Sequence, residues 1–227
     1  MCVTLTEKTA EDMIKKAEKA KAMGADIVEL RLDYLAKLDE GVIKKLIESI
    51  KIPKIATLRP EREKGLYSGE EAVRLGLLLK AISFGAEYVD LELSSDVGWR
   101  YEVSKASGKK GTKLIVSYHN FEETPCKEKL TEILKTEFAA GADIAKIATM
   151  PKTVDDVFKV ISAVNEFKRD GREVIGISMD KLGIMSRVFA KEAGSSLTYA
   201  SIEQGKESAA GQITIDKLKK IRELLEA

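Results

Sequence analysis

Short apolar segments alternate along the whole chain with longer stretches in which apolar residues recur at helical spacing. The short segments predict eight strands, over Cys2–Leu5, Ile27–Leu32, Lys54–Leu58, Tyr88–Leu93, Lys113–Tyr118, Asp143–Thr149, Glu173–Met179 and Leu197–Ser201. The longer stretches predict helices over Thr9–Met23, Gly41–Ile50, Gly69–Phe84, Val97–Ser107, Cys126–Ala140, Thr153–Arg169, Lys181–Glu192 and Thr214–Leu225. Such regular alternation is typical of a parallel sheet covered by helices.

A repeated junction supports this interpretation. Gly24, Gly85 and Gly141 each end a helical stretch, and a short apolar strand follows in GADIVELRL, GAEYVDLEL and GADIAKIAT. No linker rich in Pro, Gly or Ser divides the 227 residues. The sequence therefore predicts the α/β class and one (β/α)8 TIM barrel over residues 1–227. A doubly wound open sheet is the alternative, but its glycine-rich turn after the first strand is missing from CVTLTEKTAED.

Several strands carry charged or polar residues on one face. In the second strand Glu29 and Arg31 alternate with Val28 and Leu30, and Asp33 continues the polar series. Helices cover a parallel sheet, so these charges are costly unless they are paired or used. The same pattern recurs at Thr57 and Arg59, at Asp90 and Glu92, and at Ser117 and His119. It predicts a polar wall near the carboxyl ends of the strands.

Lys146 lies in the middle of the strand Asp-Ile-Ala-Lys-Ile-Ala-Thr. A lysine in mid-strand often protects an edge strand from aggregation, but a closed barrel has no edge. Burial favours the neutral amine, which can attack a ketone to form a Schiff base. His119, the one histidine, is either an ordinary core or loop residue or an acid–base group. Together with Arg31, Arg59 and Arg187, these residues suggest imine chemistry on an anionic carbonyl compound.

Charge and cysteine content exclude several classes of protein. Lys and Arg number 38 against 37 Asp and Glu, a net charge of +1, which argues against nucleic-acid binding. No apolar run approaches the roughly 18 residues of a membrane span, and the first residues do not resemble a signal peptide. Cys2 and Cys126 suggest neither a disulfide framework nor a zinc site. We expect a cytoplasmic protein without a membrane or nucleic-acid partner.

Six segments in order resemble the type I 3-dehydroquinate dehydratases over essentially the whole chain. They are VELRLDYL, ATLRPEREKG, SYHNF, ADIAKIATMP, SMDKLGIMSR and ESAAGQ. The resemblance implies a TIM-barrel hydro-lyase of the shikimate pathway that converts 3-dehydroquinate to 3-dehydroshikimate. It also implies that the enzyme uses neither a metal nor an organic cofactor and forms a homodimer.

The resemblance further implies a role for each matching residue. Lys146 would form the Schiff base, His119 would be the general acid and base, and Glu63 would orient His119. Arg187 would bind the substrate carboxylate. The remaining substrate-binding residues would be Glu29, Arg31, Arg59, Ser208 and Gln212. This chain departs from the family's common pattern at Asp180, where glycine or alanine is common, and at Ala210, where proline is common.

Two other functions compete with this one. A class I aldolase would use the same lysine chemistry on the same fold, and Gly205 and Gly211 could form a phosphate-binding turn. A catalytically inactive barrel would serve only as a binding module, but it would be expected to have lost Lys146 or His119. The residue set favours the dehydratase.

Overall fold

The structure is a computed structural model that describes residues 1–205 and 211–226. Its contacts divide the chain into two compact units. One unit consists of Val3–Ile115, and the other of Met1–Cys2 with Val116–Ala227. In both units strands and helices alternate along the chain, as the sequence predicts.

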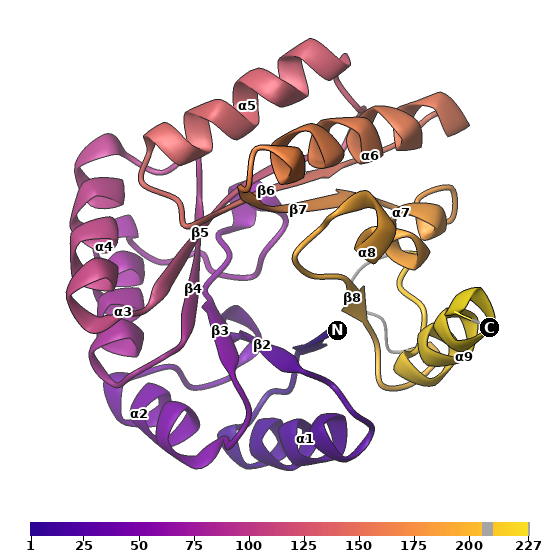
Figure 1. The fold of residues 1–227 in the computed structure, drawn as a ribbon. Helices are drawn as coiled ribbons and strands as arrows, with labels where there is room; N and C mark the ends of the chain where they lie inside the picture. Colours follow the sequence, from indigo (N-terminus) through magenta and orange to yellow (C-terminus); the bar gives the residue numbers. More distant parts are fainter. Residues whose placement is uncertain (206–210, 227) are drawn as a thin grey trace. The chain divides into compact units, whose positions relative to one another are not determined.

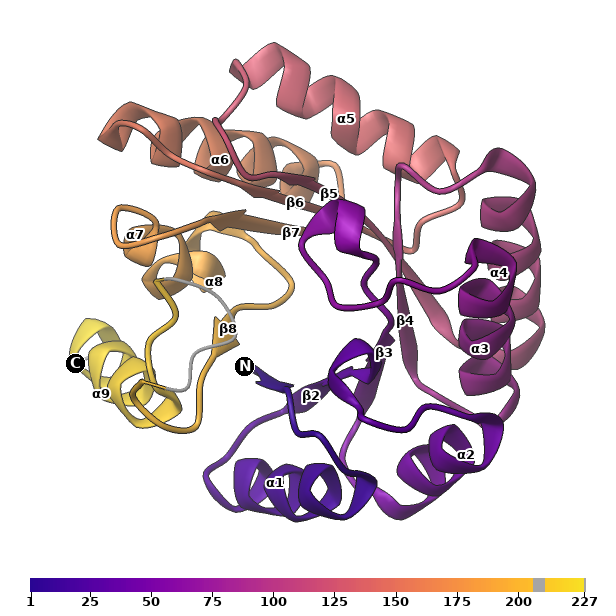
Figure 2. The ribbon, with the colours of Figure 1, turned by 180° about the vertical axis from the view of Figure 1, so that it is seen from behind.

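The unit Val3–Ile115 contains four strands in the order β4-β3-β2-β1. Its strands and α-helices are β1 (Cys2–Leu5), α1 (Ala10–Ala22), β2 (Ile27–Arg31), α2 (Glu40–Ser49), β3 (Lys54–Thr57), α3 (Glu71–Ser83), β4 (Tyr88–Glu92) and α4 (Val97–Lys110). Two 3-10 helices, η1 (Leu32–Tyr34) and η2 (Glu61–Glu63), follow β2 and β3. The pairs β2–β3 and β3–β4 are parallel. Helices α1 to α4 lie on one face of these strands (Figures 1 and 2).

The other unit contains three neighbouring strands in the order β7-β6-β5 and a short strand, β8. Its elements are β5 (Lys113–Asn120), α5 (Lys127–Ala139), β6 (Ile144–Thr149), α6 (Val154–Arg169), β7 (Glu173–Ser178), α7 (Ile184–Val188), α8 (Ala190–Ala193), β8 (Tyr199–Ala200) and α9 (Ile215–Glu226). Strands β6 and β7 pair in parallel from Ile144 with Glu173 to Thr149 with Ser178. Helix α6 packs on β7 and α5 on β6 (Figure 1).

Local sequence accounts for most element ends. The Thr9 and Thr153 side chains cap α1 and α6 by accepting from the backbone N–H three residues later, and Asp156 completes a capping box. The three glycines of the repeated junction, Gly24, Gly85 and Gly141, have φ of 83°, 95° and 93°. This left-handed conformation suits glycine, so it explains why that residue ends each helix.

One predicted element is wrong. Residues Lys181–Glu192 do not form a single helix but two short ones, α7 and α8. The Ser186 hydroxyl donates to the Gly183 carbonyl and accepts from the Ser178 N–H, so the chain turns sharply after β7 instead of entering a helix at once. Asp180, in that turn, has φ of 56°. Glycine, one of the two residues common there, adopts this conformation without strain, and Asp tolerates it better than most other residues do.

Candidate active site

Lys146 is buried in the middle of β6, with 4% of its surface exposed. Strand β6 lies between β5 and β7, so Lys146 is not on an edge strand and does not have the protective role of an edge lysine. Its ammonium nitrogen lies 5.0 Å from the ring centroid of Tyr199, in β8. An aromatic face stabilises a cation that lies over it. The lysine is therefore held in a polarisable, largely dry position.

Arg187 is the second buried cation of this unit. Only 2% of the residue is exposed, and its Nε and Nη1 have no hydrogen-bond partner among residues 1–205 and 211–226. Burial lowers the pKa of Arg187 to about 10, although Tyr199 raises it slightly. Tyr199 thus interacts with both Lys146 and Arg187. A buried guanidinium with unused donors is suited to bind an anion.

The turn after β7 determines where Arg187 lies. A Cβ on Gly183 would be 2.0 Å from the carbonyl oxygen of Ser178, so this close approach requires glycine. Helix α7 then carries Arg187, whose backbone carbonyl accepts a 3.0 Å hydrogen bond from Thr198 Oγ1. The tight turn at Gly183 and the hydrogen bond from Thr198 therefore both restrain the backbone of Arg187.

His119 is half-buried near the carboxyl end of β5. Its ring stacks on Phe121 with centroids 5.8 Å apart and an angle of 8° between the rings. The next residue, Asn120, accepts hydrogen bonds from the N–H groups of Glu122 and Glu123, and its carbonyl accepts from Met150, just after β6. The histidine is thus held at the end of its strand, as the alternating pattern predicts.

The last predicted motif is described only in part. Ser208 and Ala210 lie outside the described residues. Gln212 is buried, and the following chain joins the end of β8 through a parallel bridge between Ser201 and Thr214. A Cβ on Gly211 would be 2.0 Å from the carbonyl oxygen of Asp180, so Gln212 directly follows a close contact with the turn after β7.

In the unit Val3–Ile115, Glu29 is buried in β2 between two threonines. Its carboxylate accepts hydrogen bonds from Thr4 Oγ1 at 3.0 Å and from Thr57 Oγ1 at 2.9 Å. These residues come from the neighbouring strands β1 and β3. Hydrogen bonds of this kind satisfy a buried carboxylate and hold it at a fixed place.

Arg31 pairs with Asp33 through two bonds, Nε to Oδ1 at 2.9 Å and Nη2 to Oδ2 at 2.7 Å. Asp33 does not continue the strand, because it lies in η1, where it also accepts from the backbone N–H groups of Arg59 and Leu66. Burial by itself would lower the pKa of Arg31, but Asp33 raises it. This pair therefore fastens the loop that follows β3.

Arg59 is buried with two carboxylates. Its Nη2 lies 2.8 Å from Asp90 Oδ1 and its Nη1 lies 2.5 Å from Glu92 Oε1. Arg74, on α3, lies 2.8 Å from the other oxygen of Glu92. Burial by itself would lower the pKa of Arg59, but Asp90, Glu92 and Glu29 together raise it. We call Arg59, Arg74, Asp90 and Glu92 the Arg59 cluster.

Glu63 lies in η2, within the loop that follows Arg59, and accepts a hydrogen bond from the Ser94 hydroxyl. A Cβ on Gly65 would be 2.0 Å from the Arg59 carbonyl oxygen, so the loop folds tightly back on its start. Glu71 binds both Arg62, in this loop, and the buried Arg74. The hydrogen bond from Ser94 holds the Glu63 side chain, and the bonds of Glu71 hold the loop that carries it.

Sequence reasoning did not assign a role to Tyr199, Arg74 or Ser94. The alternating pattern did mark Asp90 and Glu92 as polar, but not as the partners of Arg59. Tyr199 belongs to a strand of two residues, and the sequence pattern there predicts only an ordinary core residue. Within residues 1–205 and 211–226 no group of three or more His, Cys, Asp or Glu residues could hold a metal ion. Of the helices described, none is both long enough and apolar enough to cross a membrane.

A family model and a curated relative both match this chain along its whole length. A family model described as type I 3-dehydroquinase matches residues 1–227. The chain is 41% identical to a 3-dehydroquinate dehydratase of Methanocaldococcus jannaschii, over 231 aligned positions that cover 100% of this chain and 99% of the relative.

Solved structures agree with the sequence matches. The 3-dehydroquinate dehydratase of Geobacillus kaustophilus has a TM-score of 0.92 and 30% identity, over 99% of this chain and 90% of that one. The type I enzyme of Clostridium difficile, solved with covalently modified comenic acid, has a TM-score of 0.90 and 31% identity with the same coverage. The chain shares their fold, and the prediction of an α/β TIM barrel is confirmed.

Proposed function

The chain belongs to the type I 3-dehydroquinase family, whose members are hydro-lyases of the shikimate pathway, and we propose that it removes water from 3-dehydroquinate through a Schiff base on Lys146. One observation carries this proposal. Lys146 and Arg187 are both buried and both interact with Tyr199, and neither Nε nor Nη1 of Arg187 has a partner in the described chain. An amine and an anion-binding group placed together suit a substrate that carries both a ketone and a carboxylate.

The reaction begins at the substrate ketone. The neutral amine of Lys146 attacks the C3 carbonyl, and loss of water gives a protonated imine. That iminium withdraws electrons from C2 and makes its proton more acidic. Burial of Lys146 supports this step, because a dry site protects the imine from early hydrolysis.

His119 then transfers the protons. It removes the C2 proton, which leaves an enamine, and it protonates the C1 hydroxyl as the C1–O bond breaks. One imidazole can act first as base and then as acid because it titrates near neutral pH. Hydrolysis of the conjugated iminium finally releases 3-dehydroshikimate and restores the Lys146 amine. The net change is the loss of one water molecule.

The other predicted residues would hold and orient the reacting groups. Arg187 would bind the substrate carboxylate with its unused donors. We assign Glu63 the orientation of His119, and its fixed place in the tight loop supports such a role. Glu29, Arg31, Arg59, Ser208 and Gln212 would contribute to binding of the substrate. Arg31 and Arg59 already hold carboxylates, so they would contribute chiefly by fixing the charge of the site.

Borohydride trapping tests the proposal. The protein is incubated with 3-dehydroquinate and borohydride, and peptide mass mapping then locates the reduced adduct. We expect a secondary amine on Lys146, none in the K146R variant, and formation of the conjugated enone in the untreated wild type. Lys54 is an internal control, because it is an equally buried strand lysine but is paired with Glu87 at 3.2 Å.

The H119A variant separates imine formation from proton transfer. It should still form the trapped adduct, while turnover falls by roughly 10² to 10⁴-fold. An adduct on another lysine, or enone formation without any adduct, would overturn the Schiff-base mechanism. Full turnover by H119A would overturn the role of the histidine.

The oligomeric state and the cellular location of the protein remain predictions. We expect a cytoplasmic homodimer that acts on a small molecule. Sedimentation at several protein concentrations would measure the oligomeric state directly.

A further inference from the structure

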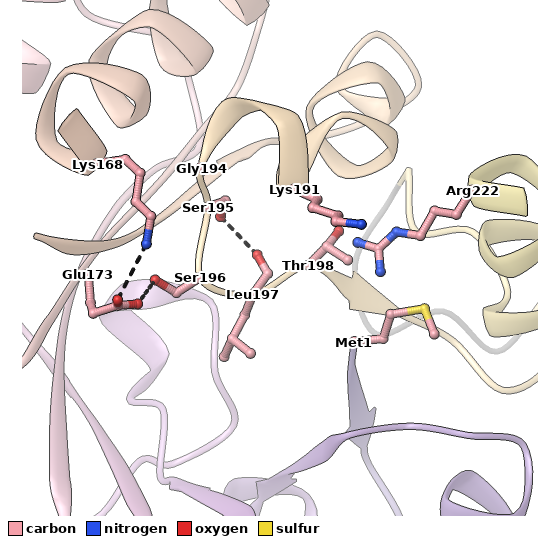
Figure 3. Close-up of a pocket in the computed structure, with 10 residues that line it drawn as sticks. All are labelled: Met1, Lys168, Glu173, Lys191, Gly194, Ser195, Ser196, Leu197, Thr198 and Arg222. Carbon is pink, nitrogen blue, oxygen red and sulfur yellow. Dashed lines mark hydrogen bonds and ion pairs between the residues drawn. The ribbon is translucent and has the colours of Figure 1, made fainter. Parts of the chain in front are cut away.

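The segment 195–201, which leads into β8, carries three serines and one threonine. The hydroxyls of Ser195, Ser196 and Thr198 each donate a hydrogen bond to a nearby acceptor, and Figure 3 shows the first two of these bonds. Ser201 differs from them. It is 3% exposed, and its Oγ has no hydrogen-bond partner within residues 1–205 and 211–226. A buried hydroxyl without a partner costs free energy, which a ligand that bonds to it would recover.

The backbone of Ser201 is held on both sides. Its N–H donates to the Ile213 carbonyl at 3.0 Å, and its carbonyl accepts from the Ile215 N–H at 2.9 Å. These two bonds make the parallel bridge between Ser201 and Thr214. Gln212 directly precedes Ile213. Ser201 therefore lies beside the segment that carries one of the predicted substrate-binding residues.

The side chain of Ser201 lies on the same face of β8 as the ring of Tyr199, because residues two apart in an extended strand point to the same side. Lys146 Nζ lies 5.0 Å from the centroid of that ring, so this face is turned toward Lys146. Two residues span about 6.6 Å along a strand, which places Ser201 one such step beyond Tyr199 toward the carboxyl end. Arg187 also lies beyond the carboxyl end of its strand, β7. TIM barrels have their active sites at this end of the strands.

We propose that Ser201 is a further substrate-binding residue, whose hydroxyl donates a hydrogen bond to the substrate carboxylate bound by Arg187. This inference rests on the proposed function. A carboxylate has about four acceptor positions, and a guanidinium fork occupies two of them. The carboxylate therefore keeps acceptor positions for a hydroxyl, and the Ser201 hydroxyl gains a partner when the substrate binds.

The C1 hydroxyl of the substrate, which departs in the reaction, is the other acceptor close to the carboxylate. A bond to the carboxylate is present both before and during the reaction, so its loss weakens binding and leaves kcat nearly unchanged. A bond to the departing oxygen strengthens as the C1–O bond breaks, so its loss would lower kcat. Binding and turnover measured together therefore identify the acceptor.

Calorimetry tests the proposal with an analogue in which a hydroxyl replaces the C3 ketone. This probe keeps the carboxylate but cannot form an imine with Lys146. S201A should raise its dissociation constant about tenfold, which corresponds to 1.4 kcal/mol, while kcat for 3-dehydroquinate changes by less than about twofold. Urea denaturation should show that S201A is at least as stable as the wild type, because the variant removes a buried hydroxyl without a partner in the described chain.

Ser107 provides the matched control. It is 1% exposed, and its Oγ likewise has no hydrogen-bond partner in the part of the chain that the structure describes. It lies in the last turn of α4, which leads into the amino end of β5 at Lys113. S107A should therefore change stability in the same direction as S201A and leave the dissociation constant of the probe unchanged.

Several results would overturn the proposal. If the wild type forms the Lys146 adduct and S201A binds the probe as tightly as the wild type does, Ser201 has no such role and the proposed function stands. A fall in kcat without a change in the dissociation constant would mean that the hydroxyl contacts the departing oxygen instead of the carboxylate. A loss of stability in S201A, or an equal loss of affinity in S107A, would show an effect of packing. If the wild type neither forms the adduct nor binds the probe, both proposals are wrong, whereas a tenfold loss of affinity without any adduct would overturn only the Schiff base.

Discussion

Two buried arginines differ in how their charges are satisfied. Arg59 is 5% exposed and Arg187 is 2% exposed, so both guanidiniums have lost most of their water. Arg59 lies between the carboxylates of Asp90 and Glu92, which raise its pKa. Arg187 has no such pair among residues 1–205 and 211–226, and burial lowers its pKa to about 10. Equal burial thus has opposite electrostatic consequences.

The difference indicates different roles. The Arg59 cluster is complete in the protein alone, so its main effect is to fix the polar ends of β3 and β4. Within the part of the chain that the structure describes, the Arg187 site is incomplete, and a buried cation with unused donors raises the free energy of the folded protein. A buried guanidinium of this kind is advantageous when an anionic ligand supplies the negative charge that pairs with it. The contrast therefore supports Arg187, more than Arg59, as the carboxylate-binding residue.

The largest expected effect comes from removing Arg59. R59M removes one buried cation from Asp90 and Glu92, while Arg74 stays beside Glu92, so we expect a loss of about 3–5 kcal/mol in the free energy of unfolding. Urea denaturation measures this loss. R169M, at an exposed helical position, should stay within about 0.5 kcal/mol of the wild type. A loss below about 1 kcal/mol in R59M would contradict the comparison.

Removing Arg187 should affect function rather than stability. R187M is expected to raise KM for 3-dehydroquinate about 100-fold, since charge-assisted hydrogen bonds are worth about 1.5–3 kcal/mol each. Its free energy of unfolding should stay equal to that of the wild type or increase, because the variant removes a buried charge that has no carboxylate partner among the described residues. Steady-state kinetics and urea denaturation of the same preparation measure both quantities. A loss of stability as large as that of R59M would show that Arg187 has a partner in the folded protein.

The smallest effect is expected at Glu71, a half-buried residue that binds Arg74 of the Arg59 cluster. A hydrogen bond from Arg74 lowers the pKa of Glu71 from its ordinary 4.5 to about 2, with burial opposing and Arg62 reinforcing this change. Because the folded pKa is lowered, the stabilisation exists above pH 4.5 and disappears as the pH falls toward 2. E71Q should therefore lose about 1 kcal/mol or less near pH 7, since Glu71 keeps contact with water.

The pH dependence distinguishes this effect from loss of packing. The difference between wild type and E71Q in the free energy of unfolding should shrink as the pH falls from 5 to 2. E70Q is the matched control, because Glu70 makes no side-chain cap hydrogen bond to α3. A difference that is independent of pH would rule out the charge interaction as its cause.

Much of the fold could be predicted from the chain, because hydrophobic periodicity and helix-ending glycines are local signals. All eight strands lie where the apolar segments predict them, and several ends differ by one or two residues. The helix over Lys181–Glu192 was not predictable in its true form. Its break depends on the Ser186 side chain and on the contact of Gly183 with Ser178, which no periodicity reveals.

The sequence by itself determined the alternation of strands and helices, the family, and the position of Lys146 within a strand. These properties depend on side-chain type and spacing, which the chain carries at every position. Only the tertiary structure decided which buried charges have partners. Arg59 meets carboxylates from β4, more than 30 residues away, whereas Arg187 meets none in the described chain. Charges in a sequence can be counted, but the free energy of a buried charge depends on its neighbours in space.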